Sequence, residues 1–104
     1  MRVIRKSQIM MALGNFKSVE NTPSRNGYGK APNQFEIRFE NGKVFQSYDS
    51  LIAVKMNDGR IYLTESHDCS NTTSGHVGRW LGGIYTKERR EGLRDGWITL
   101  IIDD

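Results

Sequence analysis

The sequence predicts an α+β fold: an antiparallel β-sheet, made of a four-stranded meander plus a C-terminal strand, with two or three short helices on one side. Three observations support this fold class. Apolar and polar residues alternate over about residues 34–64, two turn dipeptides interrupt the alternation, and helical segments separate it from a final apolar run. With 104 residues, the chain is expected to form one domain over 1–104.

The first 33 residues predict one helix and one loop. A short helix is expected after Ser7, with Ile9 and Leu13 on one side and Gly14 at its end. Residues 21–33 contain both prolines and several glycine, asparagine and serine residues, and this composition predicts a mobile loop.

The segment 34–64 predicts the meander, with two hairpins. Asn41-Gly42 is the strongest two-residue hairpin dipeptide, and it places Phe39 opposite Val44 and Phe35 opposite Tyr48. On this register Tyr48 faces the core.

The second hairpin turns at Asp58-Gly59. This turn places Met56 opposite Ile61 and Val54 opposite Leu63. Phe45 and Trp97 are likewise expected to pack inside rather than to contact a ligand.

The segment 70–104 predicts two helices and the final strand. Thr72 or Thr73 is a candidate N-cap for a helix that Gly82-Gly83 ends, and Thr86 is a candidate N-cap for a second helix that ends at Gly96. Apolar residues from 97 to 102 then predict a strand that returns to the sheet.

Composition argues against several function classes. One cysteine excludes a disulfide framework and a multi-cysteine zinc site. Cys69 lies near His67 and His76, but sequence neighbours do not make a nucleophile with an oriented base, so we expect no enzyme, no metal and no cofactor. No stretch approaches 18 apolar residues and no apolar leader begins the chain, which predicts a cytoplasmic protein without membrane contact.

Positive charge is concentrated at the N-terminus. Residues 1–30 hold six basic residues against one acidic residue, a net charge of +5, whereas the whole chain carries +3. An acidic partner would be drawn to this basic segment, and the alternative is a solvated basic arm. The candidate partner-binding residues are Arg2, Arg5, Lys6, Lys17, Arg25 and Lys30.

A second candidate site would bind phosphate. Hydroxyl side chains precede the first C-terminal helix, where free backbone N–H groups favour an anion, and arginines follow on both helices. The alternative is structural: the hydroxyls cap the helix and the arginines pair with nearby carboxylates. The candidates are Ser70, Thr72, Thr73, Arg79, Arg90 and Arg94.

Two segments resemble a known group of proteins. Residues 41–55 read Asn-Gly-Lys-Val-Phe-Gln-Ser-Tyr-Asp-Ser-Leu-Ile-Ala-Val-Lys, and residues 61–82 contain Ile-Tyr-Leu, Ser-Asn-Thr-Thr-Ser-Gly-His and Trp-Leu-Gly. They resemble a family of short bacteriophage or prophage proteins of unknown function, which share a Phe-x-Ser-Tyr hairpin and a Ser-x-Thr-Thr-x-x-His segment. The resemblance implies a phage origin, the cytoplasm of an infected bacterium, and a stoichiometric rather than catalytic role.

Three functions follow as hypotheses. The first is a non-enzymatic inhibitor that docks on a host protein or protein–nucleic-acid complex, in defence or nucleic-acid processing, through the basic segment. The second is an oligomeric sponge for a signalling nucleotide, held by the phosphate candidates. The third is a single-stranded nucleic-acid binder, in which Phe16 and Tyr28 stack among the basic residues. Unpaired sheet edges leave a homodimer open.

Overall fold

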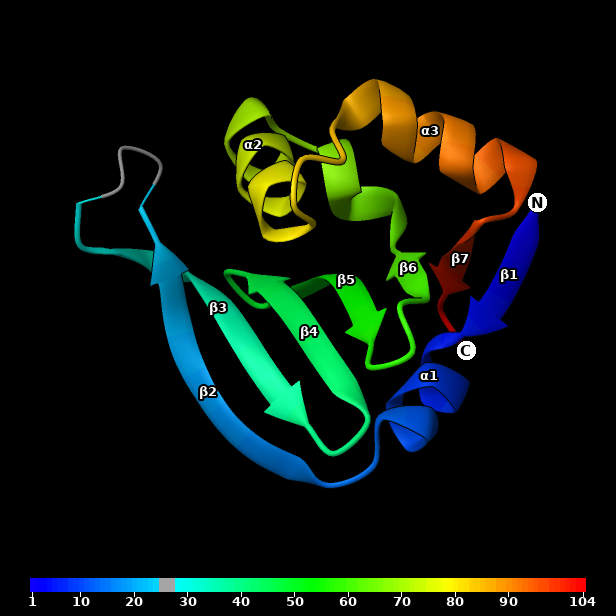
Figure 1. The fold of residues 1–104 in the computed structure, drawn as a ribbon, viewed down its shortest axis with the longest axis horizontal. Helices are drawn as coiled ribbons and strands as arrows, with labels where there is room; N and C mark the ends of the chain where they lie inside the picture. The colour runs from blue at the N-terminus through cyan, green and yellow to red at the C-terminus, as the bar shows by residue number, and fades with distance from the viewer. Residues whose placement is uncertain (25–27) are drawn as a thin grey trace.

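The computed structural model describes residues 1–24 and 28–104. Within these ranges a seven-stranded sheet has the strand order β1-β7-β6-β5-β4-β3-β2 and is accompanied by three α-helices and one short 3₁₀ helix, η1 (Figure 1). The strands are β1 (Arg2–Arg5), β2 (Phe16–Pro23), β3 (Lys30–Phe39), β4 (Gly42–Ser47), β5 (Ser50–Met56), β6 (Ile61–Leu63) and β7 (Ile98–Ile102). The helices are α1 (Lys6–Leu13), η1 (Glu65–Asp68), α2 (Asn71–Trp80) and α3 (Thr86–Asp95).

The α+β class is confirmed, whereas the expected form of the sheet is wrong. Strands β2 to β6 pair antiparallel with their neighbours, but β7 pairs parallel with both β6 and β1, so the sheet is mixed. Strand β7 returns to β6 through η1, α2 and α3, which is the long crossover that a parallel pair requires. Strand β1 then pairs with β7 from the opposite end of the chain (Figure 1).

Both predicted hairpin registers are wrong. Val44 lies opposite Ile37 rather than Phe39, and Ile61 lies opposite Lys55 rather than Met56. The first turn lies one residue earlier than predicted, at Glu40-Asn41, and the backbone N–H of Asn41 donates to the carbonyl of Leu13 at 3.0 Å, at the end of α1. A shift of one residue reverses the face of every side chain, so the second correction changes the core.

The expected loop over 21–33 is largely strand. Strand β2 continues to Pro23 and β3 begins at Lys30, while Arg25 and the two residues after it lie outside the described ranges. Two register shifts interrupt the β2–β3 pairing, and such bulges bend a strand, as β2 does along its length (Figure 1). Strand β2 is an edge strand whose first five residues are all exposed, so it shows no alternation of apolar and polar residues.

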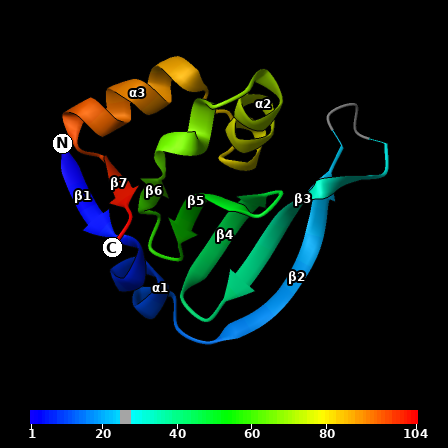
Figure 2. The ribbon, with the colours of Figure 1, turned by 180° about the vertical axis from the view of Figure 1, so that it is seen from behind.

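The helices lie on both faces of the sheet, not on one side as expected (Figures 1 and 2). Helices α2 and α3 bury Val77 and Leu93 in one apolar cluster. Phe45 and apolar residues of β5, β6 and β7 complete this cluster. Helix α1 buries Ile9 and Leu13 in a second cluster on the opposite face. No helix in the described ranges is long and apolar enough to cross a bilayer.

Two helix caps differ from the prediction. Ser70, not Thr72 or Thr73, caps α2, because its Oγ accepts the backbone N–H of Thr73 at 3.1 Å. Residue Tyr85 takes the N-cap position of α3, and Thr86 instead places its Oγ1 2.8 Å from Ser74 Oγ on α2. Thr86 therefore links two helices rather than capping one.

Two aromatic residues expected inside are exposed. Tyr48 is 62% exposed and Trp97 is 53% exposed, whereas Phe45 is fully buried as predicted. Tyr48 lies in the turn between β4 and β5 with φ of +56°, because the corrected register moves it out of the strand. A bulky residue in this left-handed region is strained.

Candidate functional site

Three basic side chains lie in register across the sheet, on the face that α2 and α3 cover in part. Lys43 on β4 lies directly opposite both Arg38 on β3 and Lys55 on β5. We call these three residues the cation row. Neighbouring strands lie about 4.8 Å apart, so the row spans about 10 Å. Like charges directly opposite each other destabilise a sheet, so stability alone does not account for this arrangement.

Trp80, the last residue of α2, lies against the cation row. Lys55 Nζ donates to the Trp80 carbonyl at 3.1 Å and lies 4.8 Å from the centre of the indole ring. The indole Nε1 donates to Glu36 Oε1 at 2.9 Å. Burial opposes ionisation of Glu36, but hydrogen bonds from Trp80 and Arg38 outweigh it and lower the pKa of Glu36. The row thus adjoins a half-buried aromatic ring held at two points.

The charges of the row are only partly compensated. Arg38 forms ion pairs with Glu36 at 3.0 Å and Glu20 at 3.4 Å. Lys43 and Lys55 form no ion pair with the residues of 1–24 and 28–104. Burial, and then the charge of Lys43, lower the pKa of Lys55. Two ammonium groups therefore face each other without a direct ion pair, and the nearby carboxylate of Glu36 attracts both of them. An anionic ligand would add the compensation that a single carboxylate leaves incomplete.

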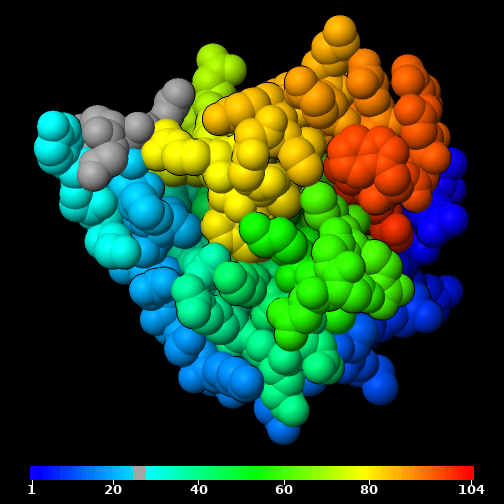
Figure 3. Space-filling model, viewed as in Figure 1, coloured from blue at the N-terminus to red at the C-terminus, as the bar shows by residue number. Residues whose placement is uncertain are grey.

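The side chains of this region reach the surface beside α2. In the space-filling view, strands β3 to β5 (cyan to green) are open to solvent next to α2 (yellow) (Figure 3). Arg38 is exposed, and Lys43 and Lys55 are half-buried. A ligand can therefore reach the row without any movement of a helix.

The predicted basic segment does not form one surface. Arg2 and Arg5 lie on β1 and Lys6 begins α1, at one edge of the sheet. Lys17 on β2 lies at the other edge, with Lys30 at the start of the neighbouring strand β3. Arg25 lies outside the described residues. A cluster in the sequence thus becomes two groups separated by the width of the sheet.

The predicted phosphate site is also dispersed. Arg79 lies about 10 Å along α2 from Thr72 and donates to the Ser24 carbonyl at 2.8 Å. Arg90 pairs with Asp68 at 2.7 Å. The remaining candidate arginine, Arg94, pairs with Asp95 at 3.0 Å, and Thr73 is buried. The hydroxyl and guanidinium groups therefore meet structural partners and do not converge on one anion.

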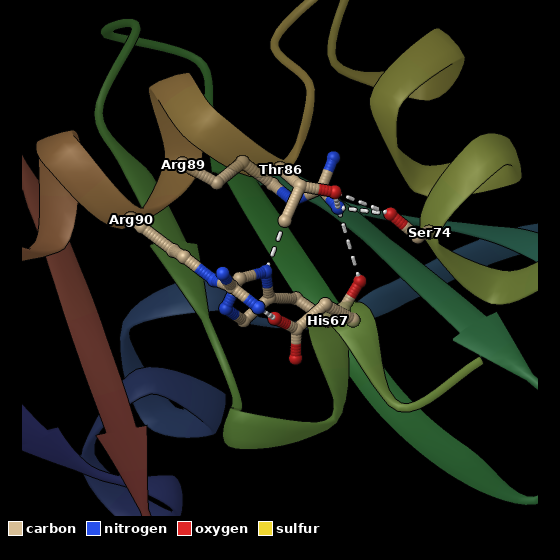
Figure 4. A network of polar contacts seen from close by, with 6 residues as sticks. His67, Ser74, Thr86, Arg89 and Arg90 are labelled. Carbon is tan, nitrogen blue, oxygen red and sulfur yellow. Dashed lines mark hydrogen bonds and ion pairs between the residues drawn. The ribbon is translucent and has the colours of Figure 1, made fainter. Parts of the chain in front are cut away.

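The arginine that sequence reasoning passed over, Arg89, is fully buried between the helices (Figure 4). Its Nε donates to His67 Nδ1 at 2.9 Å, its Nη1 to the Ile84 carbonyl at 2.9 Å and its Nη2 to Ser74 Oγ at 2.6 Å. Thr86 Oγ1 and the His67 carbonyl accept weaker bonds at 3.3 Å. One guanidinium thus joins η1, α2 and α3, a structural role.

The hydrogen bonds around Arg89 determine the protonation state of the His67 imidazole. Burial lowers the pKa of His67, and the charges of Arg89 and Arg90 add to the shift although Asp68 opposes it. Because Nδ1 accepts from Arg89, the imidazole is neutral with its proton on Nε2. Cys69 is exposed and has no hydrogen bond to His67 in the described part of the chain. Nor do three of His, Cys, Asp and Glu come together there in a way that could hold a metal ion.

A hollow of about 390 Å³ opens at the carboxyl ends of β6 and β7. Carboxylates of Asp49, Glu65 and Asp103 line it, with Lys6 the one cation among its described lining residues. Its charge is therefore opposite to that of the cation row, and it does not suit a phosphate group.

Sequence reasoning missed the cation row because its members lie far apart in the chain and become neighbours only through register. Arg38 and Lys43 lie on either side of the first turn, and a two-residue turn at Glu40-Asn41 instead of Asn41-Gly42 pairs them. Lys55 enters the row through the next hairpin.

Comparison with known proteins places the chain in a family without assigning it an activity. Residues 13–98 match a family of unknown function, DUF8033, and the chain therefore belongs to that family. No curated protein and no solved structure matches it.

Proposed function

We propose that this protein is a small non-enzymatic binding protein that acts stoichiometrically, and that it binds single-stranded nucleic acid, free or held in a nucleic-acid-processing complex. The observation that supports this function is the cation row, in which Lys43 lies opposite both Arg38 and Lys55. Phosphates placed along the row would remove the repulsion between these side chains.

A single strand suits the surface better than a duplex. Proteins that bind single strands combine a positive track for the backbone with aromatic side chains for the bases. Trp80 supplies an aromatic ring beside Lys55, with the ammonium group 4.8 Å from the ring centre. The described residues offer no exposed helix carrying several unpaired arginines that would enter a major groove, since Arg90 and Arg94 on α3 are ion-paired.

Fluorescence anisotropy with a labelled single-stranded oligonucleotide of about 12 nucleotides tests the proposal, because single-strand sites typically cover about 4–16 nucleotides. The variant K43Q/K55Q should weaken binding at least tenfold. It should also make the dependence of log affinity on log salt shallower by about 1.4, since each phosphate contact to a single strand contributes about 0.7.

The matched control is R2Q/R5Q, which removes the same charge from β1 at the far edge of the sheet. This control should retain the salt dependence of the wild type. Absence of binding to any oligonucleotide, or an equal loss in both variants, would reject the cation row as the binding surface.

The narrower version of the proposal places the protein in a phage-infected bacterium, acting on a host defence complex. A pull-down from bacterial lysate, with and without nuclease, addresses it. Partners that disappear on nuclease treatment support binding through nucleic acid. A stoichiometric partner that survives nuclease supports direct docking on a protein and argues against the nucleic-acid proposal.

A further inference from the structure

A small pocket lies where the last turn of α2 meets the end of β2. Trp80 lines this pocket and also contacts the cation row. The pocket has a volume of about 150 Å³ and is lined by Thr22, Pro23, His76, Arg79 and Trp80. Helix α2 presents the last three of these residues, which are spaced by three and by one. Strand β2 supplies the other two from the opposite wall.

The size of the pocket restricts its ligand to a single ring. A protein cavity of about 150 Å³ accepts benzene, whereas sites for drug-sized molecules occupy about 300–1,000 Å³. A six-membered heterocycle of pyrimidine size therefore fills the pocket, and the second ring of a purine would protrude from it.

The walls combine an apolar surface with a few polar groups. Trp80 and Pro23 provide flat apolar surface, and Arg79 brings a guanidinium group with five N–H donors. One of these donors is committed to the Ser24 carbonyl at 2.8 Å. The Oγ1 atom of Thr22 is buried and has no hydrogen-bond partner among residues 1–24 and 28–104. Pyrimidine bases carry carbonyl oxygens on their edges, which accept from such donors.

Trp80 connects the pocket to the cation row. The residue lines the pocket, and its carbonyl and ring also hold Lys55 at 3.1 Å and 4.8 Å. Lys43 lies directly opposite Lys55 on the neighbouring strand. A base in the pocket would thus leave its own backbone phosphates next to the ammonium groups of the row.

We propose that the pocket between α2 and β2 takes one pyrimidine base of a single strand whose phosphates lie along the cation row. This inference rests on the proposed function and adds a base preference to it. The indole ring of Trp80 and the guanidinium group of Arg79 recognise the base, and a single ring fits the pocket better than the two rings of a purine.

The test compares three oligonucleotides that share one backbone and differ only at the central position. Labelled 10-nucleotide strands made of abasic sites carry a single central thymine, a single central adenine, or no base. An isolated base avoids the self-stacking of adenine runs. The thymine strand should bind about 5- to 150-fold more tightly than the abasic strand, the range that one stacked base contributes. The adenine strand should bind more weakly than the thymine strand.

Two variants assign the effect to the pocket. Arg79 is exposed, so Arg79→Gln should leave the fold intact while it reduces the thymine advantage at least threefold. In Trp97→Phe, which leaves Trp80 as the one remaining tryptophan, the thymine strand should quench the fluorescence and the abasic strand should not.

The outcomes separate the inference from the proposed function. If a strand with a full set of bases binds, but thymine, adenine and no base give equal affinities, the pocket inference is wrong and the nucleic-acid proposal stands. A thymine advantage that Arg79→Gln leaves unchanged also rejects the pocket. If no strand of any kind binds, the proposed function itself is wrong.

Discussion

Replacing Lys43 by glutamate should remove binding and stabilise the protein at the same time. Lys43 lies between two other cations, Arg38 on β3 and Lys55 on β5. Lys43→Glu converts two like-charge pairs into two opposite-charge pairs. Most single substitutions destabilise a protein by about 1 kcal/mol, so a gain in stability together with a loss of binding would be a specific result.

The magnitude follows from the neighbours. Opposite charges directly across a strand pair contribute about 0.2–1 kcal/mol, and like charges there are unfavourable. Arg38 already has two carboxylate partners, and Lys43 also acts on Glu36, whose pKa its charge helps to lower. These terms offset most of the Arg38 contribution, which leaves the Lys55 pair and a net gain of about 0.5 kcal/mol. That gain corresponds to a rise in Tm of about 2–4 °C for a domain of this size.

Thermal unfolding at low and high salt measures the effect. The gain in Tm should shrink in 1 M salt, where the Debye length is about 3 Å. Lys17→Glu is the matched control, because it makes the same charge change on the edge strand β2 outside the row. A second readout is the pKa of Lys55, which should rise in Lys43→Glu because the repulsion from Lys43 contributes to its lowering.

Two results would refute this reasoning. The first is a Tm that falls or stays constant at low salt, which would mean that the facing ammonium groups do not repel each other measurably. The second is an oligonucleotide affinity that survives in Lys43→Glu, which would mean that the row is not the binding surface.

Three further predictions concern other parts of the molecule. Arg89→Lys should lower the free energy of unfolding by about 3 kcal/mol or more in urea titrations, because buried acceptors lose their donors, whereas Arg90→Lys at the exposed ion pair should cost less than about 1 kcal/mol. Stability should fall as pH drops below 6.5, the ordinary pKa of histidine, since the unfolded chain then binds a proton that native His67 resists, and His67→Gln should flatten this slope. Tyr48→Asn should raise stability by up to about 1 kcal/mol in thermal unfolding, because asparagine tolerates φ of +56° better; a loss would show that the exposed ring contributes contacts.

The sequence predicts the elements whose evidence is local. Alternation from Phe35 to Phe39 and the dipeptide Asp58-Gly59 locate strands β3 to β6 to within a few residues. The polar edge strand β2 has no such pattern because both of its faces are largely exposed. The parallel pairing of β1 with β7 joins residues 97 positions apart, such as Arg2 and Thr99, and no local pattern encodes it.

The candidate site is harder to predict because it depends on register. The charge count of the first thirty residues is correct, yet β1 and β2 carry these charges to opposite edges of the sheet. The cation row instead draws on a segment with no net basic excess, and Arg38 joins it through a first turn that lies one residue earlier than predicted. The position of that turn is tied to α1 by the bond from Asn41 to Leu13, a long-range contact that a linear pattern does not contain.

The position of β7 between β6 and β1 has a consequence for synthesis of the chain on the ribosome. Strand β1 is made first and β6 is complete at Leu63, but the strand that joins them ends at Ile102, 39 residues later. At about 5–20 residues per second, the edge of β6 waits on the order of 2–8 s for this partner, and β1 waits longer. During that interval β6 exposes an unpaired apolar edge, which is the kind of edge that pairs with other chains. The nascent protein should therefore depend most on chaperone protection after β6 has emerged and before β7 has inserted.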